Sequence, residues 1–251
     1  MVVEAKQIME VLDMAAESGA ARFLSRWTRR WEIIPLLVIL AVNMSIYSGV
    51  GTLTAGWHHY DLTLSFDRQV PLIPEFIWIY VVPSYLFWGI CYILTAQNGK
   101  DYFYRFVACD LTIHLICLLF FVILPTTNVR PEVAGNTLSE RFLLLTYQID
   151  GGDLPGNLFP SIHCYVSWLS FRGVKEVKSL PRWFSPASCV MAILIIISTQ
   201  VLKQHYIVDA IAAVLLVEIF WRFYRTGNRH MGVYRFFEKI NSFVWKGKQD
   251  L

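Results

Sequence analysis

Long apolar runs separated by short charged segments dominate the chain. A helix that crosses a bilayer needs about 20 mostly apolar residues, because each residue adds about 1.5 Å. Five runs meet this length: roughly Glu32–Val50, Phe76–Ala96, Phe106–Leu124, Phe184–Leu202 and Tyr206–Phe223. A sixth run, Ile162–Phe171, is weaker because Arg172, Lys175 and Lys178 follow it directly. The pattern predicts an all-α protein, a polytopic bundle of transmembrane helices.

The basic residues decide whether the sixth run is a span. With six spans and both chain ends in the cytoplasm, 18 of the 22 Lys and Arg residues lie on the cytoplasmic side. The other 4 lie outside, and they are Arg68, Arg130, Arg141 and Lys203. This asymmetry agrees with the positive-inside rule, and it is lost if the weak run is dropped. We therefore predict a multi-pass integral membrane protein with six transmembrane helices and cytoplasmic N- and C-termini.

The segments that flank the spans are more polar. Before the first span, apolar residues recur at helical spacing beside Arg22, Arg26 and Arg29, which predicts an N-terminal interfacial amphipathic helix. A partly frayed tail is the alternative. The expected division is an N-terminal cytoplasmic or interfacial segment (1–31), a six-span domain (32–224) and a basic cytoplasmic tail (225–251).

Composition agrees with a membrane protein and narrows its partners. The chain is 55% hydrophobic and 16% charged, whereas soluble domains have about 25% charged residues. The net charge of +3 is spread over short clusters instead of one stripe, so we expect no nucleic-acid partner. The five cysteines form no paired motif, and no His-rich metal spacing occurs. We expect no metal and no cofactor.

Ionisable residues at the ends of spans are costly and mark candidate functional sites. Three segments carry them, and the six-span topology places all three on the non-cytoplasmic face. They are Arg130-Pro131, Pro160-Ser161-Ile162-His163 and the stretch from Lys203 through His205 to Asp209. His205 and Asp209 are four residues apart at the start of a helix, so they share a face. The carboxylate can hold one imidazole nitrogen as N–H and leave the other free as a nucleophile.

The other two segments supply groups that attract an anion. Pro160 is favoured in the first turn of a helix, where free N–H groups and the Ser161 hydroxyl can hold an anion near His163. Arg130 and Lys203 add fixed positive charge. Two histidines, two cations and a helix N-terminus together predict phosphoryl transfer through a phosphohistidine.

In their order and spacing these motifs resemble the signature of the type 2 phosphatidic acid phosphatase superfamily, which is Lys-x6-Arg-Pro, Pro-Ser-Gly-His and Ser-Arg-x5-His-x3-Asp. The chain departs from it at three positions: Ile123 replaces the first Lys, Ile162 replaces the Gly, and Thr199 replaces the third-motif Arg. The segment around Lys203 and His205 looks more like the inositol phosphorylceramide synthase branch.

The resemblance implies a role for each matched residue. His205 would attack phosphorus, Asp209 would orient it, and His163 would protonate the leaving oxygen and then activate the acceptor. Arg130 and Ser161 would hold phosphate oxygens, with Lys203 supplying the missing charge. The implied activity is metal-independent hydrolysis of a membrane lipid phosphate or diphosphate. The alternatives are a phosphoinositol-type headgroup transferase and an inactive lipid-binding or transport relative.

Further polar residues have both a structural and a functional interpretation. Asp150 and Asp153 precede the second motif; we favour a solvated turn over contact with a substrate headgroup. A short helix is expected around Leu138–Tyr147. Asp110 and His114, four apart within a span, either assist catalysis or satisfy each other, and we favour the second.

Overall fold

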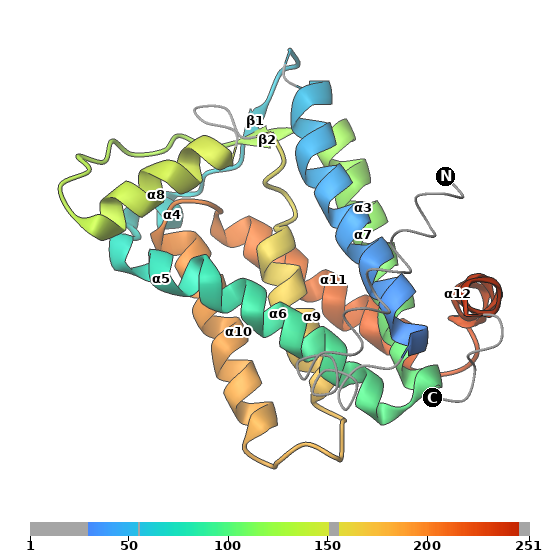
Figure 1. Cartoon of the computed structure of the whole chain (residues 1–251). Coiled ribbons are helices and arrows are strands. Elements are labelled where there is room, and N and C mark those ends of the chain that lie inside the picture. Colours follow the sequence, from blue (N-terminus) through green and yellow to red (C-terminus); the bar gives the residue numbers. More distant parts are fainter. Residues whose placement is uncertain (1–29, 55, 151–155, 246–251) are drawn as a thin grey trace.

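The computed structural model describes residues 30–54, 56–150 and 156–245, and almost all of its regular structure is helical (Figure 1). The strands β1 and β2 are two residues long and pair in parallel. In chain order the elements are α3 (Arg30–Thr54), β1 (Tyr60–Asp61), α4 (Ser65–Gln69), η1 (Pro74–Phe76), α5 (Ile77–Tyr80), α6 (Val82–Thr95), η2 (Ala96–Asn98), α7 (Lys100–Ile123), β2 (Thr126–Thr127), α8 (Leu138–Ile149), α9 (Ile162–Val174), α10 (Phe184–Val201), α11 (Ile207–Arg225) and α12 (Met231–Val244).

Four helical segments in the described part of the chain are long and apolar enough to cross a membrane. They are Trp31–Thr54, Pro74–Asn98, Lys100–Ile123 and Phe184–Val201. The other two predicted spans are also helical, but α9 has 13 residues and α11 carries several charged residues, among them Asp209, Glu218 and Arg222. At about 1.5 Å per residue, α9 is about 20 Å long, which is less than the bilayer core. The six-span count therefore stays a prediction.

Helix α9 lies at the centre of the bundle. It packs against α6, α7, α10 and α11, as Figure 1 shows. Its residues Cys164, Tyr165 and Leu169 are completely buried among these neighbours. None of the residues of α9 is exposed, and its polar residue Ser167 accepts a 2.9 Å hydrogen bond from Trp88 of α6.

The segment predicted as one helix over Phe76–Ala96 is interrupted. The α5 helix ends at Tyr80, Val81 has non-helical dihedral angles (φ −82°, ψ −89°), and α6 begins at Val82. Pro83 explains the break, because it has no N–H to donate to the carbonyl group one turn earlier, and it is accommodated in the first turn of α6. The break separates Tyr80 from the axis of α6, and Tyr80 turns toward the start of α9.

Charged residues tie together the bundle end that holds the start of α7 and the end of α11. Arg105 of α7 donates hydrogen bonds to the carbonyl groups of Tyr224, Arg225 and Gly227. Lys100 forms an ion pair with Glu238 of α12 at 2.7 Å. All three candidate functional segments lie at the opposite helix ends, after α7 and at the starts of α9 and α11.

The intramembrane pair Asp110 and His114 forms part of a buried polar cluster. His114 Nδ1 lies 3.1 Å from Asp110 Oδ2, and Tyr92 donates a 2.6 Å hydrogen bond to Asp110. The Tyr165 hydroxyl lies 2.6 Å from His114 Nδ1. These contacts satisfy the polar groups across α6, α7 and α9, as a buried pair requires.

The predictions for the segments outside the spans have different outcomes. The expected helix around Leu138–Tyr147 is confirmed as α8, which begins with a capping box in which the Thr137 side chain accepts from Glu140 N–H. Within the basic tail, Met231–Val244 forms α12, which packs on α3 and α7. The predicted N-terminal amphipathic helix lies outside the described residues.

Gly173 permits the close approach of α9 to its neighbours, which gives a first test of the packing. A Cβ at this position would lie 2.7 Å from the buried ring of Phe106 and 2.7 Å from Thr95 Oγ1. We expect Gly173→Ala to destabilise the protein by about 1–3 kcal/mol, the usual effect of overpacking. The matched control is Gly232→Ala in α12, where nothing lies within 4 Å and alanine is the better helix former. Thermal unfolding in detergent should separate the two variants, and equal unfolding temperatures would contradict this packing.

Candidate active site

The turn between α10 and α11 holds His205 against the end of α10. The backbone N–H groups of Gln204 and His205 both donate to the carbonyl of Thr199, at 3.0 and 3.1 Å. Lys203 adopts a left-handed conformation (φ 55°), which reverses the chain between the two helices. His205 therefore lies just before α11 and is 6% exposed.

The loop before α5 fixes the same turn from outside. The buried carboxylate of Asp67 accepts a 2.8 Å hydrogen bond from Ile207 N–H, the first residue of α11. Lys203 Nζ donates to the carbonyl groups of Asp67 and Val70. From the segment after α7, Asn128 donates to the carbonyl of Lys203 at 2.7 Å. The segment before α5 and the segment after α7, both far from His205 in sequence, thus help to determine where its ring lies.

Asp209 lies one helical turn after His205 and faces it. Its Oδ2 is 3.4 Å from His205 Nδ1 and accepts a 2.9 Å hydrogen bond from Tyr206 N–H. The pair is buried, with Asp209 1% exposed. This geometry lets the carboxylate orient the imidazole and leaves Nε2 as the nitrogen available for reaction.

His163, in the first turn of α9, is held by aromatic rings. Its ring stacks on Tyr80 at a centroid distance of 4.6 Å and meets the edge of Trp88 at 5.3 Å. Its Nε2 has no hydrogen-bond partner among the described residues. The ring centroids of His163 and His205 are 6.0 Å apart. A group bonded to one imidazole can therefore reach the other.

Short strand contacts bring Arg130 to the two histidines. Thr126 of β2 pairs with Tyr60 and bridges to Asn157, and Thr126 Oγ1 accepts from Phe159 N–H at 2.9 Å. These contacts align the chain after α7 with the chain before α9.

The Arg130 side chain is then held in place. Its guanidinium donates to the carbonyl of Tyr147 at 2.6 Å, to the carbonyl of Asp150 at 3.1 Å and to Gln204 Oε1 at 3.1 Å. It also lies 4.6 Å from the centroid of the Tyr147 ring.

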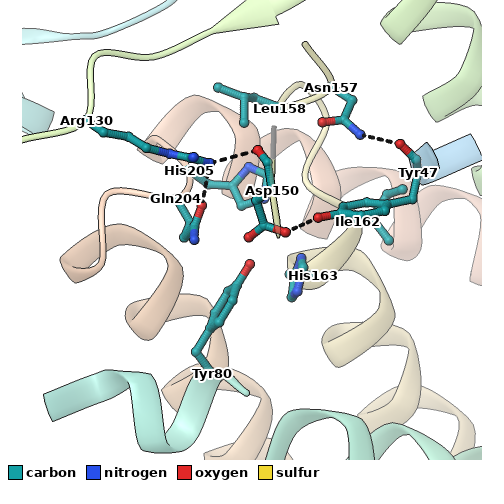
Figure 2. A pocket seen from close by; sticks show the side chains of 10 residues that line it. All are labelled: Tyr47, Tyr80, Arg130, Asp150, Asn157, Leu158, Ile162, His163, Gln204 and His205. Atoms are coloured by element: carbon teal, nitrogen blue, oxygen red, sulfur yellow. Dashed lines mark hydrogen bonds between the residues drawn. The ribbon is translucent and has the colours of Figure 1, made fainter. Parts of the chain in front are cut away.

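Asp150 contributes a second carboxylate to the site, which corrects our preference for a solvated turn. Figure 2 shows its side chain pointing between Tyr80, His163 and Gln204. The Tyr47 hydroxyl of α3 donates a hydrogen bond to it. Burial raises the pKa of Asp150 to about 6, and the nearby His205 and Gln204 only partly offset this effect. Asp153 lies outside the described residues.

These side chains line one partly open pocket. The lining residues are Tyr47, Tyr80, Arg130, Asp150, Asn157, Leu158, Ile162, His163, Gln204 and His205. The N–H groups of Ile162 and His163 lie at the first positions of α9, where helix geometry leaves them without a partner in the helix. With Arg130 they make the pocket suitable for an anion.

Two predicted phosphate-binding residues lie outside this pocket lining. Ser161 is completely buried, and its hydroxyl accepts a 3.2 Å hydrogen bond from Cys164 N–H as the N-cap of α9. Lys203 lines a separate hollow with Asp61, Asp67 and Tyr206. The sequence placed their motifs correctly, but both side chains bind backbone groups: Ser161 that of Cys164 in its own helix, and Lys203 those of the distant Asp67 and Val70.

A family comparison agrees with this arrangement. A family model described as the PAP2 superfamily matches residues 59–223. The chain belongs to this superfamily. PAP2 denotes type 2 phosphatidic acid phosphatase, so the resemblance seen in the motifs is confirmed at the level of the superfamily. Separate searches of the curated proteins and of the solved structures found no match.

Membership in the PAP2 superfamily suggests a phosphatase or phosphotransferase activity. Together with the four apolar helices, it indicates a membrane protein. Among the described residues, no group of three or more His, Cys, Asp or Glu side chains is arranged to hold a metal ion.

Several pocket residues lie outside the PAP2 motifs. Gln204 directly precedes His205, so its position in the catalytic turn was a usable signal. Tyr47 and Tyr80 lie in apolar runs, where a tyrosine in the pocket looks the same as a tyrosine in the core. For Asp150, the sequence offered contact with a substrate headgroup only as the less favoured of two interpretations. Its contact with α3 is long-range and leaves no local pattern.

The raised pKa of Asp150 predicts a pH-dependent stability. In the unfolded chain this carboxyl has a pKa of about 4, whereas in the folded protein it is about 6. The folded state therefore binds the proton more tightly, and its advantage is complete below about pH 4 and lost as the pH rises through about 6.

We expect Asp150→Asn to be about 2 kcal/mol more stable than the wild type at pH 7 and nearly equal to it at pH 4. Thermal unfolding of the purified protein at both pH values would measure this difference. The exposed Glu132, changed to Gln, is the control. A difference between Asp150→Asn and the wild type that does not change with pH would show that the carboxyl titrates normally.

Proposed function

We propose that this protein is a metal-independent lipid phosphatase that cleaves a membrane lipid phosphate through a phosphohistidine at His205. The observation that carries the proposal is the facing pair His163 and His205, with Asp209 behind the second ring and Arg130 at the same pocket. An ordered nucleophile, an opposing acid and base, and anion-binding groups are the parts that phosphoryl transfer requires.

In the first step, His205 Nε2 attacks phosphorus and the bond from phosphorus to the lipid oxygen breaks. His163, which the negative charge of the bound substrate keeps protonated, gives its proton to the leaving oxygen and becomes neutral. Asp209 stabilises the positive charge that forms on the phosphorylated His205 ring. Arg130 and the N–H groups at the start of α9 bind the phosphate oxygens.

In the second step, neutral His163 takes a proton from water, and the hydroxide attacks phosphorus. The bond from phosphorus to His205 Nε2 breaks, which releases phosphate and restores both histidines. The 6.0 Å distance between the rings supports this exchange of roles, because one small group can contact both. Tyr80 and Trp88 hold His163 in position throughout.

The proposal includes a topology of six membrane crossings with both ends in the cytoplasm and the pocket on the other side. The position of Arg105, Lys100 and Arg225 at the bundle end opposite the pocket supports it, since basic residues favour the cytoplasmic side. Substrate and surrounding partners would then be membrane lipids, which reach the pocket from the non-cytoplasmic leaflet.

A headgroup transferase is the second candidate. Here the acceptor in the second step is the hydroxyl group of another lipid, and the phosphoryl group still carries a headgroup. The observation in its favour is Asp150, a carboxylate inside an anion-binding pocket, where a headgroup with hydrogen-bond donors fits better than bare phosphate.

The nucleophile assignment gives the next prediction. His205→Ala should lower the release of diacylglycerol from phosphatidate by about a thousandfold or more, because no covalent route remains. The exposed His58, changed to Ala, is a matched control and should retain full activity. Rapid quenching with labelled phosphatidate should trap acid-labile, base-stable phosphate on the wild type and none on His205→Ala.

A loss of less than about tenfold would exclude His205 as the nucleophile. Lipid binding without turnover in the wild type would instead support an inactive lipid-binding or transport relative.

A further inference from the structure

The proposed mechanism uses His163, His205, Asp209 and Arg130 but gives no role to Asp150. This carboxylate nevertheless lies in the same pocket, at the end of α8. Its backbone carbonyl is tied to Arg130 at 3.1 Å, so the residue cannot leave without releasing the guanidinium. The Tyr47 hydroxyl reaches it from α3. Asp150 is therefore a fixed part of the site.

Because of its surroundings, the negative charge of Asp150 affects the binding of a phosphate group in the pocket. Its side chain faces His163 and Tyr80 on one side and Gln204 and His205 on another (Figure 2). Burial raises its pKa to about 6, so the group is still mainly ionised at pH 7.5. A negative charge in a pocket that binds phosphate repels a second negative charge most strongly where water is excluded.

Lipid phosphates differ in the negative charge that the phosphate group carries. A phosphate monoester carries close to two negative charges at neutral pH. A phosphodiester carries one, and its second substituent is a headgroup. A headgroup that bears a hydroxyl or ammonium group can donate a hydrogen bond to a carboxylate, and such charge-assisted bonds are strong.

We propose that Asp150 selects the substrate by charge, favouring a lipid phosphodiester with a hydrogen-bond-donating headgroup over a lipid phosphate monoester. The inference rests on the proposed phosphoryl transfer at His205, and of the two candidate functions it favours the headgroup transferase over the phosphatase. Asp150 belongs to the segment between α7 and α9, outside the candidate spans, where the polar headgroup of a membrane lipid would lie. After diacylglycerol leaves, the headgroup stays attached to phosphorus on His205 and keeps its contact with Asp150.

The test compares substrates in the full-length protein reconstituted in vesicles at pH 7.5. The monoester is phosphatidate, and the diesters are phosphatidylglycerol, with hydroxyl donors, and phosphatidylethanolamine, with an ammonium group. Release of diacylglycerol is common to all three and does not depend on the acceptor. Glu132→Gln removes an exposed carboxylate before α8 and is the matched control.

For Asp150→Asn we expect kcat/KM to rise about tenfold with phosphatidate and to fall about tenfold with the preferred diester. The diester with the larger fall identifies the donor as hydroxyl or ammonium. Asp150→Ser serves as a second variant if Asn does not give a folded protein. A ratio of the two kcat/KM values within about threefold of the wild-type ratio overturns the proposal, and so does an equal fall with all substrates.

Two further measurements separate this inference from the proposed function. If diacylglycerol release persists in His205→Ala, the proposed function is wrong whatever the substrate ratio. If release depends on His205 and Asp150→Asn does not change the ratio of the two kcat/KM values, only the proposed role of Asp150 is wrong. Independently of turnover, inorganic phosphate should protect Asp150→Asn against thermal unfolding at about tenfold lower concentration than it protects the wild type, and equal protection counts against selection by charge.

Discussion

The position of His205 depends on the turn between α10 and α11. That turn reverses the chain at Lys203. Its N–H groups donate to the Thr199 carbonyl and the Asp67 carboxylate, and its Lys203 carbonyl accepts from Asn128. Because these groups are buried, breaking any contact leaves a polar atom without water or partner. The fold therefore keeps the imidazole and Asp209 in one arrangement, and every function considered for the pocket requires that arrangement.

The pocket combines a rigid aromatic wall with groups of both charges. Tyr80 and Trp88 fix the ring of His163, whereas Arg130 is fixed by backbone carbonyl groups at the end of α8. Because Asp150 lies in the same pocket as Arg130, we propose that binding there depends on the charge of the bound group. In the proposed mechanism, selection of the substrate and catalysis use different residues of one pocket, so substitution should separate them.

The helices were predictable because their signal is local: apolar runs of the length of a bilayer identify α3, α7 and α10 directly. The motifs with His163, His205 and Asp209 were predictable because their order and spacing lie in the sequence. The break at Val81 and the N-cap role of Ser161 are local effects of Pro83 and Cys164 that the apolar pattern does not show, whereas the direction of Lys203 depends on tertiary contacts with Asp67 and Val70. Asp150 belongs to the same class, since Tyr47 lies 103 residues away.

The central claim is that phosphorus is bonded to His205 between two displacements. The stereochemical course at phosphorus tests it most directly, with a lipid substrate whose reacting phosphorus is made chiral by oxygen isotopes or sulfur. Each in-line displacement inverts the configuration, so two successive displacements should give overall retention in the product. Net inversion would show direct attack by the acceptor and would contradict the covalent mechanism.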